Sequence, residues 1–286
     1  MDLNRRAMIA LAGAAAAASP AAWSAPAPEI AAIEAGLGGR VGVAVLNTAT
    51  GARIVHRADE RFPMCSTFKG VTVGAVLRRV DAGREQLDRH ISYTAADLLE
   101  YAPTTRANVA RGWMTVGALC EAAVELSDNT AANLLLASLG GPPAVTAFAC
   151  SIGDPVTRLD RNEPSLNTAI PGDPRDTTSP SAMLGDLRAL VLGKALSDAS
   201  RATFTGWLVG SQTGGNRLRA GLPAGWRVGD KTGTGEGGAT NTIAVLWPPA
   251  GGPIIACVYC VGSKAPRPTI EAAHAKIGAI IARSMG

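Results

Sequence analysis

The sequence predicts a mixed α and β (α+β) fold, in which one antiparallel sheet with flanking helices is built from both chain ends. An all-helical domain is inserted between the two parts of this sheet. Three observations carry the prediction. Strand-like apolar runs occur at residues 40–56 and again at 226–261, whereas helical periodicity fills residues 66–209. The chain has 286 residues, of which 47% are hydrophobic, enough to bury a large core.

The first 27 residues are typical of an export signal. Asn4-Arg5-Arg6 gives a positive start, the run from Ala7 to Ala18 is apolar, and small residues follow it. The apolar run is too short to cross a bilayer well. The adjacent Arg5 and Arg6 are a feature of twin-arginine signals. We therefore expect an exported protein, periplasmic or secreted, without stable membrane insertion.

The first two strands are predicted at residues 40–46 and 52–56, where apolar residues flank a turn at 48–51. We assign residues 28–62 and 211–286 to the α/β domain and residues 63–210 to the all-helical domain. A binding site in this architecture belongs in the cleft where the two parts meet.

Apolar periodicity broken by Gly and Pro clusters predicts the remaining elements. The predicted helices of the insert are 67–80, 115–125, 130–139, 143–151, 180–192 and 198–209. The later strands and the closing amphipathic helix are predicted at 226–230, 242–247, 253–261 and 268–283.

Composition argues against several classes of partner. The net charge is +4, without a long basic run, and the chain has only three Tyr and four Phe, so we expect no nucleic-acid partner. The three histidines, His56, His90 and His274, lack the spacing of metal ligands. We therefore expect neither a metal nor another cofactor.

The five cysteines are an odd number, so at least one is unpaired within the chain. Cys257 and Cys260 are three residues apart on a predicted strand and should point to opposite faces of the sheet. We expect free, buried thiols.

Ser66 and Lys69 could form a nucleophile and its proton acceptor. They are three residues apart at the start of a predicted helix, where side chains at i and i+3 share a face. A serine hydroxyl is a poor nucleophile until a base takes its proton, and a desolvated lysine can be that base. The alternative is a polar helix start with a solvated lysine.

Two further polar clusters lie in the helical region. Ser127-Asp128-Asn129 offers a hydroxyl and an amide, or only an N-cap for the helix predicted to start near Thr130. Residues 158–178 form a long polar loop in which Glu163 and Asn167 could position a water molecule. The alternative is a mobile surface loop.

The fourth cluster, Asp230-Lys231-Thr232-Gly233-Thr234-Gly235, is predicted to end a strand and open a turn. Its lysine and two hydroxyls suit the binding of an anion such as a carboxylate. Gly233 would let another molecule approach the backbone closely. The alternative is a glycine-rich hairpin turn with a solvated lysine.

Together these clusters closely resemble the serine β-lactamases of class A, which have the β-lactamase/transpeptidase-like fold. The matching motifs are Ser66-Thr67-Phe68-Lys69, Ser127-Asp128-Asn129, Glu163-Pro164-Ser165-Leu166-Asn167 and Lys231-Thr232-Gly233. The resemblance covers residues 28–286. It implies hydrolysis of penicillins and cephalosporins through a serine acyl-enzyme, and so antibiotic resistance. It also implies a small-molecule β-lactam substrate and a monomer.

The resemblance implies a role for each site residue. The implied catalytic residues are Ser66, Lys69, Ser127 and Glu163. The implied substrate-binding residues are Asn129, Asn167, Lys231, Thr232, Gly233, Thr234, Arg217 and Tyr101. Ser66 and Thr234 would donate backbone N–H groups to the oxyanion, and either Lys69 or Glu163 would activate Ser66.

Two further features of the long loop follow from the resemblance. It implies that Arg161 and Asp176, which carry opposite charges, pair and close the 161–176 loop. It also implies a cis peptide bond between Glu163 and Pro164.

Two disulfides found in some relatives should not form in this chain. Where those relatives have the second cysteine of each bridge, this chain has Val73 as the partner position of Cys120 and Gly235 as that of Cys65. The second bridge is found in several carbapenem-hydrolysing relatives, so carbapenem activity is in doubt.

Two other functions share parts of this pattern. A penicillin-binding DD-peptidase would have no use for Glu163 and Asn167, because their water would hydrolyse the acyl group. A non-catalytic β-lactam sensor would need a membrane segment or a signalling domain, which the sequence after the leader does not suggest.

Overall fold

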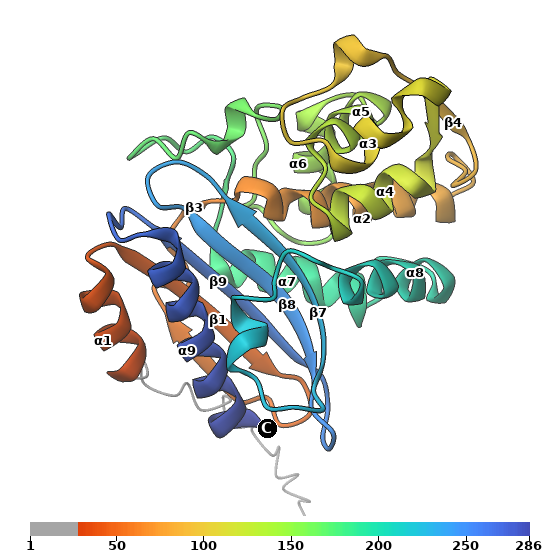
Figure 1. Cartoon of the computed structure of the whole chain (residues 1–286). Coiled ribbons are helices and arrows are strands. Elements are labelled where there is room, and N and C mark those ends of the chain that lie inside the picture. Colours follow the sequence, from red (N-terminus) through yellow and green to blue (C-terminus); the bar gives the residue numbers. More distant parts are fainter. Residues whose placement is uncertain (1–27) are drawn as a thin grey trace, which may run out of the picture.

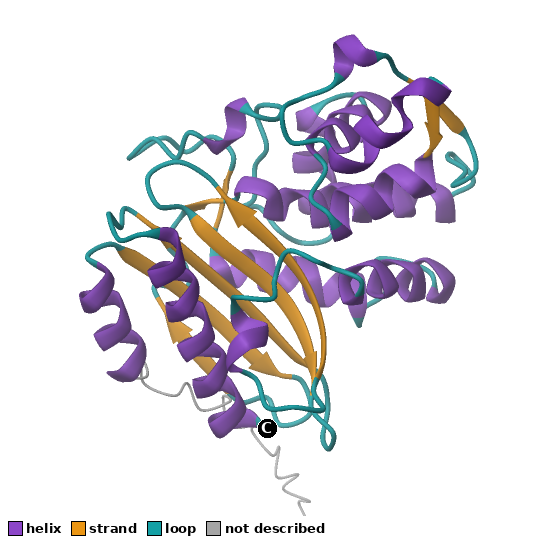
Figure 2. Ribbon diagram, in the orientation of Figure 1, coloured by secondary structure: helices purple, strands orange, loops and turns teal. Residues whose placement is uncertain are grey.

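The computed structural model describes residues 28–286, so the predicted export signal lies outside the described residues. Its centre is a five-stranded antiparallel sheet in the order β2-β1-β9-β8-β7 (Figures 1 and 2). These strands are β1 Arg40–Asn47, β2 Arg53–His56, β7 Arg227–Thr234, β8 Thr240–Trp247 and β9 Ile254–Val261. Because β1 pairs with β9, both ends of the chain share one sheet, as predicted.

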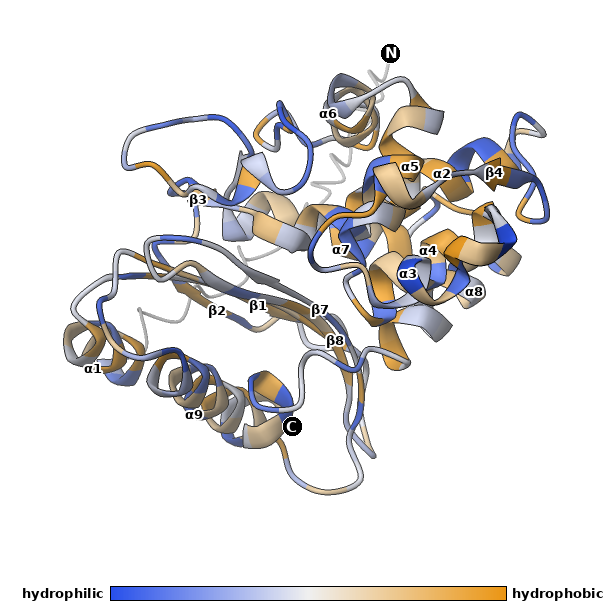
Figure 3. Cartoon of the chain, turned by 45° about the horizontal axis from the view of Figure 1, so that its top comes forward, coloured by the Kyte–Doolittle hydropathy of each residue, from blue (hydrophilic) through white to orange (hydrophobic). Residues whose placement is uncertain are grey.

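Helices cover both faces of this sheet. α1 (Pro28–Leu37) and α9 (Arg267–Met285) lie on one face, and α7 (Pro180–Val191) and α8 (Asp198–Val209) lie on the other (Figures 1 and 3). Successive side chains of a strand point to opposite faces, so β9 is buried on both. Cys257 packs into the core beside α7, whereas Cys260 packs into the core beside α9, which confirms the prediction for this pair.

The helical part is packed around α2 (Phe68–Asp81), in which every residue from Phe68 to Leu77 is buried. A helix that is apolar on all sides belongs in a protein interior. The helices around it are α3 Pro103–Asn108, α4 Val116–Glu125, α5 Asn129–Leu139 and α6 Pro142–Ser151. All six predicted helices of the insert and the closing helix are therefore present, within a few residues of their predicted bounds.

The division into two domains stays a prediction, because α7 belongs to both packing units. A side chain added at Gly74 of α2 would meet Leu190 of α7, and one added at Gly42 of β1 would meet Pro180 of the same helix. α7 thus packs between the sheet and α2.

Two helices and two short strand pairs were not predicted. α1 directly follows the leader, and α3 has only six residues. Two small antiparallel pairs, β3 (Phe62–Pro63) with β6 (Thr177–Thr178) and β4 (His90–Ser92) with β5 (Trp113–Thr115), are too short for a periodic signal. The β3–β6 pair matters for the site, because it joins the end of the long polar loop to the segment before Ser66.

Two of the differences from the predicted element bounds affect the candidate site. β7 continues to Thr234, so Lys231-Thr232-Gly233 lies on the strand rather than in a turn. The ladder with β8 continues past Asp230, where Lys231 pairs with Ile243 and Thr234 with Thr240. α5 begins at Asn129, one residue earlier than predicted, because Asp128 is its N-cap.

Among residues 28–286, no single helix is long and apolar enough to cross a membrane. α5 and α6 pass that test only as a pair, and they are bent by 72° at the break between them.

Candidate active site

Ser66 lies in a 3₁₀ turn, Cys65–Thr67, directly before α2. The Asn241 side chain of β8 holds this turn by donating to the carbonyl oxygens of Pro63 and Met64, at 2.8 and 3.0 Å. Cys65 has a φ of 45°, a left-handed conformation that is uncommon for a residue with a side chain. Such backbone strain gathers at functional sites, where the surrounding structure holds it in place.

Lys69 is completely buried one turn further along α2. Its amine donates to the Ser127 carbonyl oxygen at 2.8 Å and to Asn129 Oδ1 at 2.6 Å, and it lies 3.1 Å from Glu163 Oε1. Burial lowers the pKa of Lys69, and the nearby Glu163 carboxylate opposes that shift. The buried amine is thus closer to neutrality than an exposed lysine, as a proton acceptor requires.

The Glu163 carboxylate joins the two groups. The Ser66 hydroxyl donates to its Oε1 atom at 3.1 Å, the same oxygen that contacts Lys69. Asn167 Nδ2 donates to the other oxygen at 2.5 Å. The long loop therefore brings a carboxylate to the Ser66 hydroxyl and an amide to that carboxylate.

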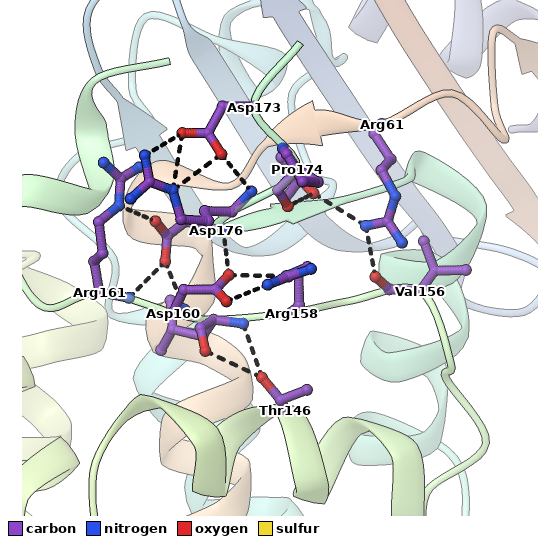
Figure 4. A network of polar contacts seen from close by, with 12 residues as sticks. Arg61, Thr146, Val156, Arg158, Asp160, Arg161, Asp173, Pro174 and Asp176 are labelled. Atoms are coloured by element: carbon purple, nitrogen blue, oxygen red, sulfur yellow. Dashed lines mark hydrogen bonds and ion pairs between the residues drawn. The ribbon is translucent and has the colours of Figure 1, made fainter. Parts of the chain in front are cut away.

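The 161–176 loop is closed by the predicted pair. Arg161 Nε lies 2.6 Å from Asp176 Oδ2, and Asp176 Oδ1 also accepts the backbone N–H groups of Asp160 and Arg161 (Figure 4). Asp176 is fully buried and Arg158 pairs with Asp160 beside it. The peptide bond between Glu163 and Pro164 is cis. Both predictions for this loop are confirmed.

Ser127 lies between two lysines. Lys231 Nζ donates to its hydroxyl oxygen at 2.9 Å and Lys69 Nζ at 3.3 Å. Lys231 is completely buried, and its burial, with repulsion from Lys69, holds its pKa well below the ordinary value. Neighbouring Asp128 is the N-cap of α5 and accepts the N–H of Ala131 at 2.9 Å, so the capping interpretation is right for this residue.

Strand β7 forms the opposite wall of the site. A Cβ atom at Gly233 would fall 2.7 Å from the Met64 oxygen and 3.2 Å from the Ser66 nitrogen. At Gly233 the chain's own Ser66 turn makes a close approach to the backbone, and the expected approach of another molecule stays a prediction. The absence of a side chain brings β7, including Thr234, against Ser66.

Arg217 lies behind this wall and is only 4% exposed. Its guanidinium donates to Thr234 Oγ1 at 2.7 Å and to the carbonyl oxygens of Gly233 and Asn241 at 2.9 and 2.7 Å. Burial lowers the pKa of Arg217, whereas Glu271, 3.3 Å away, raises it. Arg217 thus supports the wall through Thr234.

Tyr101 is apart from this hydrogen-bonded network. Its side chain is 51% exposed, and its carbonyl oxygen accepts the N–H of Asn129 at 3.1 Å. An exposed aromatic ring beside Asn129 suits contact with a ligand at the rim.

Asn133 was missed by the sequence reasoning. Its side chain accepts the Glu163 N–H at 3.0 Å and donates to the Glu163 carbonyl oxygen at 2.9 Å, so it clamps the backbone of the carboxylate residue. The available signal was spacing, because Asn133 follows Asn129 by four residues on α5 and shares its face.

The arrangement suits acyl transfer. It contains a serine hydroxyl in contact with a carboxylate, two buried lysines that share a second hydroxyl, and a strand edge beside the serine N–H. Acyl transfer needs groups of these kinds: a nucleophile, a base and donors for a developing oxyanion.

Comparisons with known proteins agree with this chemistry. A family model described as "Beta-lactamase enzyme family" matches residues 25–285. β-Lactamase Toho-1 of Escherichia coli is 51% identical over 231 residues, which are 81% of this chain and 79% of the relative. β-Lactamase AST-1 of Nocardia asteroides is 50% identical over 237 residues, or 83% and 76% of the two chains.

Solved structures of class A β-lactamases are similar to this chain over most of its length. An ancestral (GNCA) class A β-lactamase is 59% identical with a TM-score of 0.88, covering 90% of this chain and 98% of its own. A putative class A β-lactamase, PenP from Rhodopseudomonas palustris, is 58% identical with a TM-score of 0.89, covering 92% and 100%.

Proposed function

The chain belongs to the class A serine β-lactamases, and we propose that it opens the β-lactam ring with Ser66 as the nucleophile. The chain hydrolyses the β-lactam amide bond of penicillins and cephalosporins, and so confers antibiotic resistance. The observation that carries the assignment of Ser66 is its hydrogen bond, 3.1 Å long, to Glu163 Oε1.

Acylation begins when the Ser66 proton leaves and Oγ attacks the lactam carbonyl carbon. The two candidate bases are in contact with each other, because Glu163 Oε1 lies against Lys69 Nζ. The same oxygen accepts from Ser66 Oγ. This geometry favours Glu163 as the immediate proton acceptor, with Lys69 as the neighbour that exchanges the proton with it. A base at this distance is worth roughly two to four decades in rate.

The ring opens when the C–N bond breaks and the lactam nitrogen takes a proton. Ser127 is the group we assign to that transfer. Its hydroxyl can give up its proton because Lys69 and Lys231, both within 3.3 Å, can replace it and stabilise the transient negative charge.

The substrate is oriented by both walls of the cleft. The charge of Lys231 and the hydroxyls of Thr232 and Thr234 suit the carboxylate that penicillins and cephalosporins carry, and Asn129 suits the side-chain amide. The N–H groups of Ser66 and Thr234 are assigned to the oxyanion. The close packing of Gly233 on the Ser66 turn supports that assignment.

Deacylation needs a water molecule next to the ester carbon. Glu163 takes a proton from this water as the oxygen attacks, and Asn167 fixes the direction of the carboxylate from 2.5 Å. The ester C–O bond then breaks, and Ser66 recovers its proton. The Asn133 clamp keeps Glu163 in reach throughout.

The test follows the Ser66 adduct by intact mass. Mixed with a chromogenic cephalosporin, the parent protein should turn over many equivalents. Ser66→Ala should neither turn over nor gain the mass of the acyl group. An adduct that persists on Ser66→Ala would show that the nucleophile is another residue.

The two alternative functions predict a different time course. A DD-peptidase or a β-lactam sensor would give one stoichiometric burst without repeated turnover. The contact of Glu163 with Ser66, and of Asn167 with Glu163, argues against both, because it supplies a base for deacylation.

We further propose that the protein is an exported monomer. The leader Asn4-Arg5-Arg6 followed by an apolar run supports export, with the adjacent arginines favouring the twin-arginine route. Mass spectrometry of the protein recovered from the periplasm or medium should show a start near residue 28, and light scattering should give the mass of one chain.

A further inference from the structure

A cavity that Ser66 does not line lies beside the 161–176 loop. It has a volume of about 510 Å³, within the range of small-molecule sites. Its wall is made by the 161–176 loop, the start of β1, the end of β9 and the loop after β7. The side chains that line it do not include Ser66, Lys69, Ser127, Glu163 or Lys231.

Four arginines and two carboxylates, Asp173 and Glu236, line this cavity. Arg40, Arg161 and Arg175 each form an ion pair, with Glu60, Asp176 and Asp173. Arg61 differs, because within residues 28–286 it has no carboxylate partner. It is the cation of this wall that is left for a ligand.

The Arg61 guanidinium is held in place by one of its three nitrogens. Nη1 donates to the Val156 carbonyl oxygen at 2.7 Å and to Thr177 Oγ1 at 3.0 Å, which uses both of its N–H bonds (Figure 4 shows the contact with Val156). The N–H groups of Nε and Nη2 then remain. These two nitrogens form an edge that matches the two oxygens of a carboxylate.

The rest of the wall is largely apolar. Pro63, Leu166, Ala169, Ile170, Pro171 and Val261 contribute to it. The Ile170 side chain is 51% exposed, which makes it one of three large exposed apolar side chains in the described chain. Glu236 also lines the cavity, and its backbone N–H donates to the Asn167 carbonyl oxygen at 2.8 Å.

We propose that this cavity is a second binding site, for a small molecule that joins one carboxylate to a flat apolar body. The carboxylate takes the Nε and Nη2 edge of Arg61, and the apolar body lies against the exposed side chains of Ile170 and Pro171. The ligand would thus contact the 161–176 loop, which also carries Glu163 and Asn167.

The test uses 2-naphthoate as the probe and 2-naphthamide as its uncharged counterpart. Backbone amide signals of the labelled protein, followed by NMR during titration, should shift at Ala169, Ile170 and Gly237. 2-Naphthamide should bind at least about tenfold more weakly, because it lacks the charge that Arg61 recognises. This comparison needs no variant.

Arg61→Gln should weaken the binding of 2-naphthoate about tenfold or more, and Arg61→Lys, which keeps the charge but not the two-pronged edge, by less. The matched control is Arg227→Gln, an exposed arginine stacked on Trp247, which should leave binding unchanged.

Two outcomes would overturn the proposal. One is equal affinity of the Arg61→Gln and parent proteins for 2-naphthoate. The other is pure competition with a chromogenic cephalosporin, with shifts confined to Ser127 and Lys231, which would place the probe in the active site. Neither outcome bears on the assignment of Ser66, which the adduct measurement tests separately.

Discussion

Lys69 and Glu163 form an ion pair in the active site, with 3.1 Å between Nζ and Oε1 and neither side chain exposed to solvent. Two charges in so dry a place are costly unless each also finds hydrogen-bond partners. Here the hydrogen-bond partners are other residues of the site. Glu163 accepts from the Ser66 hydroxyl, and Lys69 donates to Ser127 and Asn129. The pair therefore links the acylation and deacylation groups.

Removing the Glu163 charge should stop the reaction after acylation. In Glu163→Gln the amide cannot take a proton from water, so deacylation should slow by roughly two to four decades. Acylation should slow less, because Lys69, the other candidate base for Ser66, remains. Intact mass after mixing with benzylpenicillin should then show a lasting adduct on Ser66. Glu100→Gln, at an exposed carboxylate, is the control and should turn over like the parent. Turnover by Glu163→Gln at the parent rate would contradict the mechanism.

The same variant should shift the titration of Lys69. Burial lowers the pKa of Lys69, and Glu163 raises it through its charge and its hydrogen bond. Without the Glu163 charge only burial and weaker neighbours remain, so the Lys69 pKa should fall further in Glu163→Gln. The ¹³Cε shift of Lys69, followed by NMR against pH, should have its midpoint at lower pH in the variant. A midpoint that stays or rises would mean that Glu163 does not hold the lysine proton.

Most of the fold could be predicted because its signals are local. The apolar period of 3.6 or 2 residues marks each long helix and strand, and the Gly and Pro clusters mark their ends. The two-residue pair β3–β6 has no period to detect, although it anchors the loop that holds Glu163. Its existence depends on tertiary contacts, such as the bond from the Met64 N–H to the Asp176 carbonyl oxygen.

The residues of the candidate site could be predicted where they belong to sequence motifs. The residues outside the motifs that hold them in place could not. Asn133 and Asn241 hold Glu163 and the Ser66 turn through single amide side chains, which sequence alone does not distinguish from surface residues. The end of β7 was predicted too early, because its last residues are polar and glycine-containing. The ladder with β8 overrides that weak local preference.

Arg217→Ala should lower kcat/KM for penicillins and cephalosporins by about one to two decades. The charged group contributes roughly 1.5–3 kcal/mol to the contacts it holds, and its loss frees Thr234 and two buried carbonyl oxygens. Steady-state kinetics should show the loss, and Arg217→Lys should not restore it, because one ammonium cannot span the same three acceptors. Arg227→Ala serves as the surface control. An unchanged kcat/KM would show that Arg217 does not contribute to the reaction.

Thiol titration should find five free thiols in the denatured, non-reduced protein and one that reacts readily in the native protein. All five cysteines are free, and only Cys150 is exposed. Burial raises the pKa of Cys65 to about 12 and keeps it in the unreactive thiol form. A disulfide from Cys65 or Cys120, detected by peptide mapping, would contradict this. So would fast native labelling of either residue.

Asp186 of α7 should make the protein less stable as the pH rises. It is 1% exposed beside Asp154, and one carboxylate oxygen of each residue is buried without a partner. Burial, with the Asp154 charge, raises the Asp186 pKa from 3.8 to about 9. A proton held on Asp186 can be shared with Asp154, whose Oδ1 atom accepts the N–H groups of Val156 and Thr157.

The sign follows from which state binds the proton. Between pH 4 and 9 the folded protein keeps a proton on Asp186 that the unfolded chain releases, so the free energy of unfolding falls as pH rises, by at most about 1.4 kcal/mol per pH unit. Asp186→Asn supplies the donor without titrating. It should flatten the curve of melting temperature against pH and be more stable than the parent at pH 8. Asp198→Asn, at a side chain that is 96% exposed, should keep the parent's slope. If the Asp186→Asn protein shows the parent's slope as well, the proton is not held at Asp186.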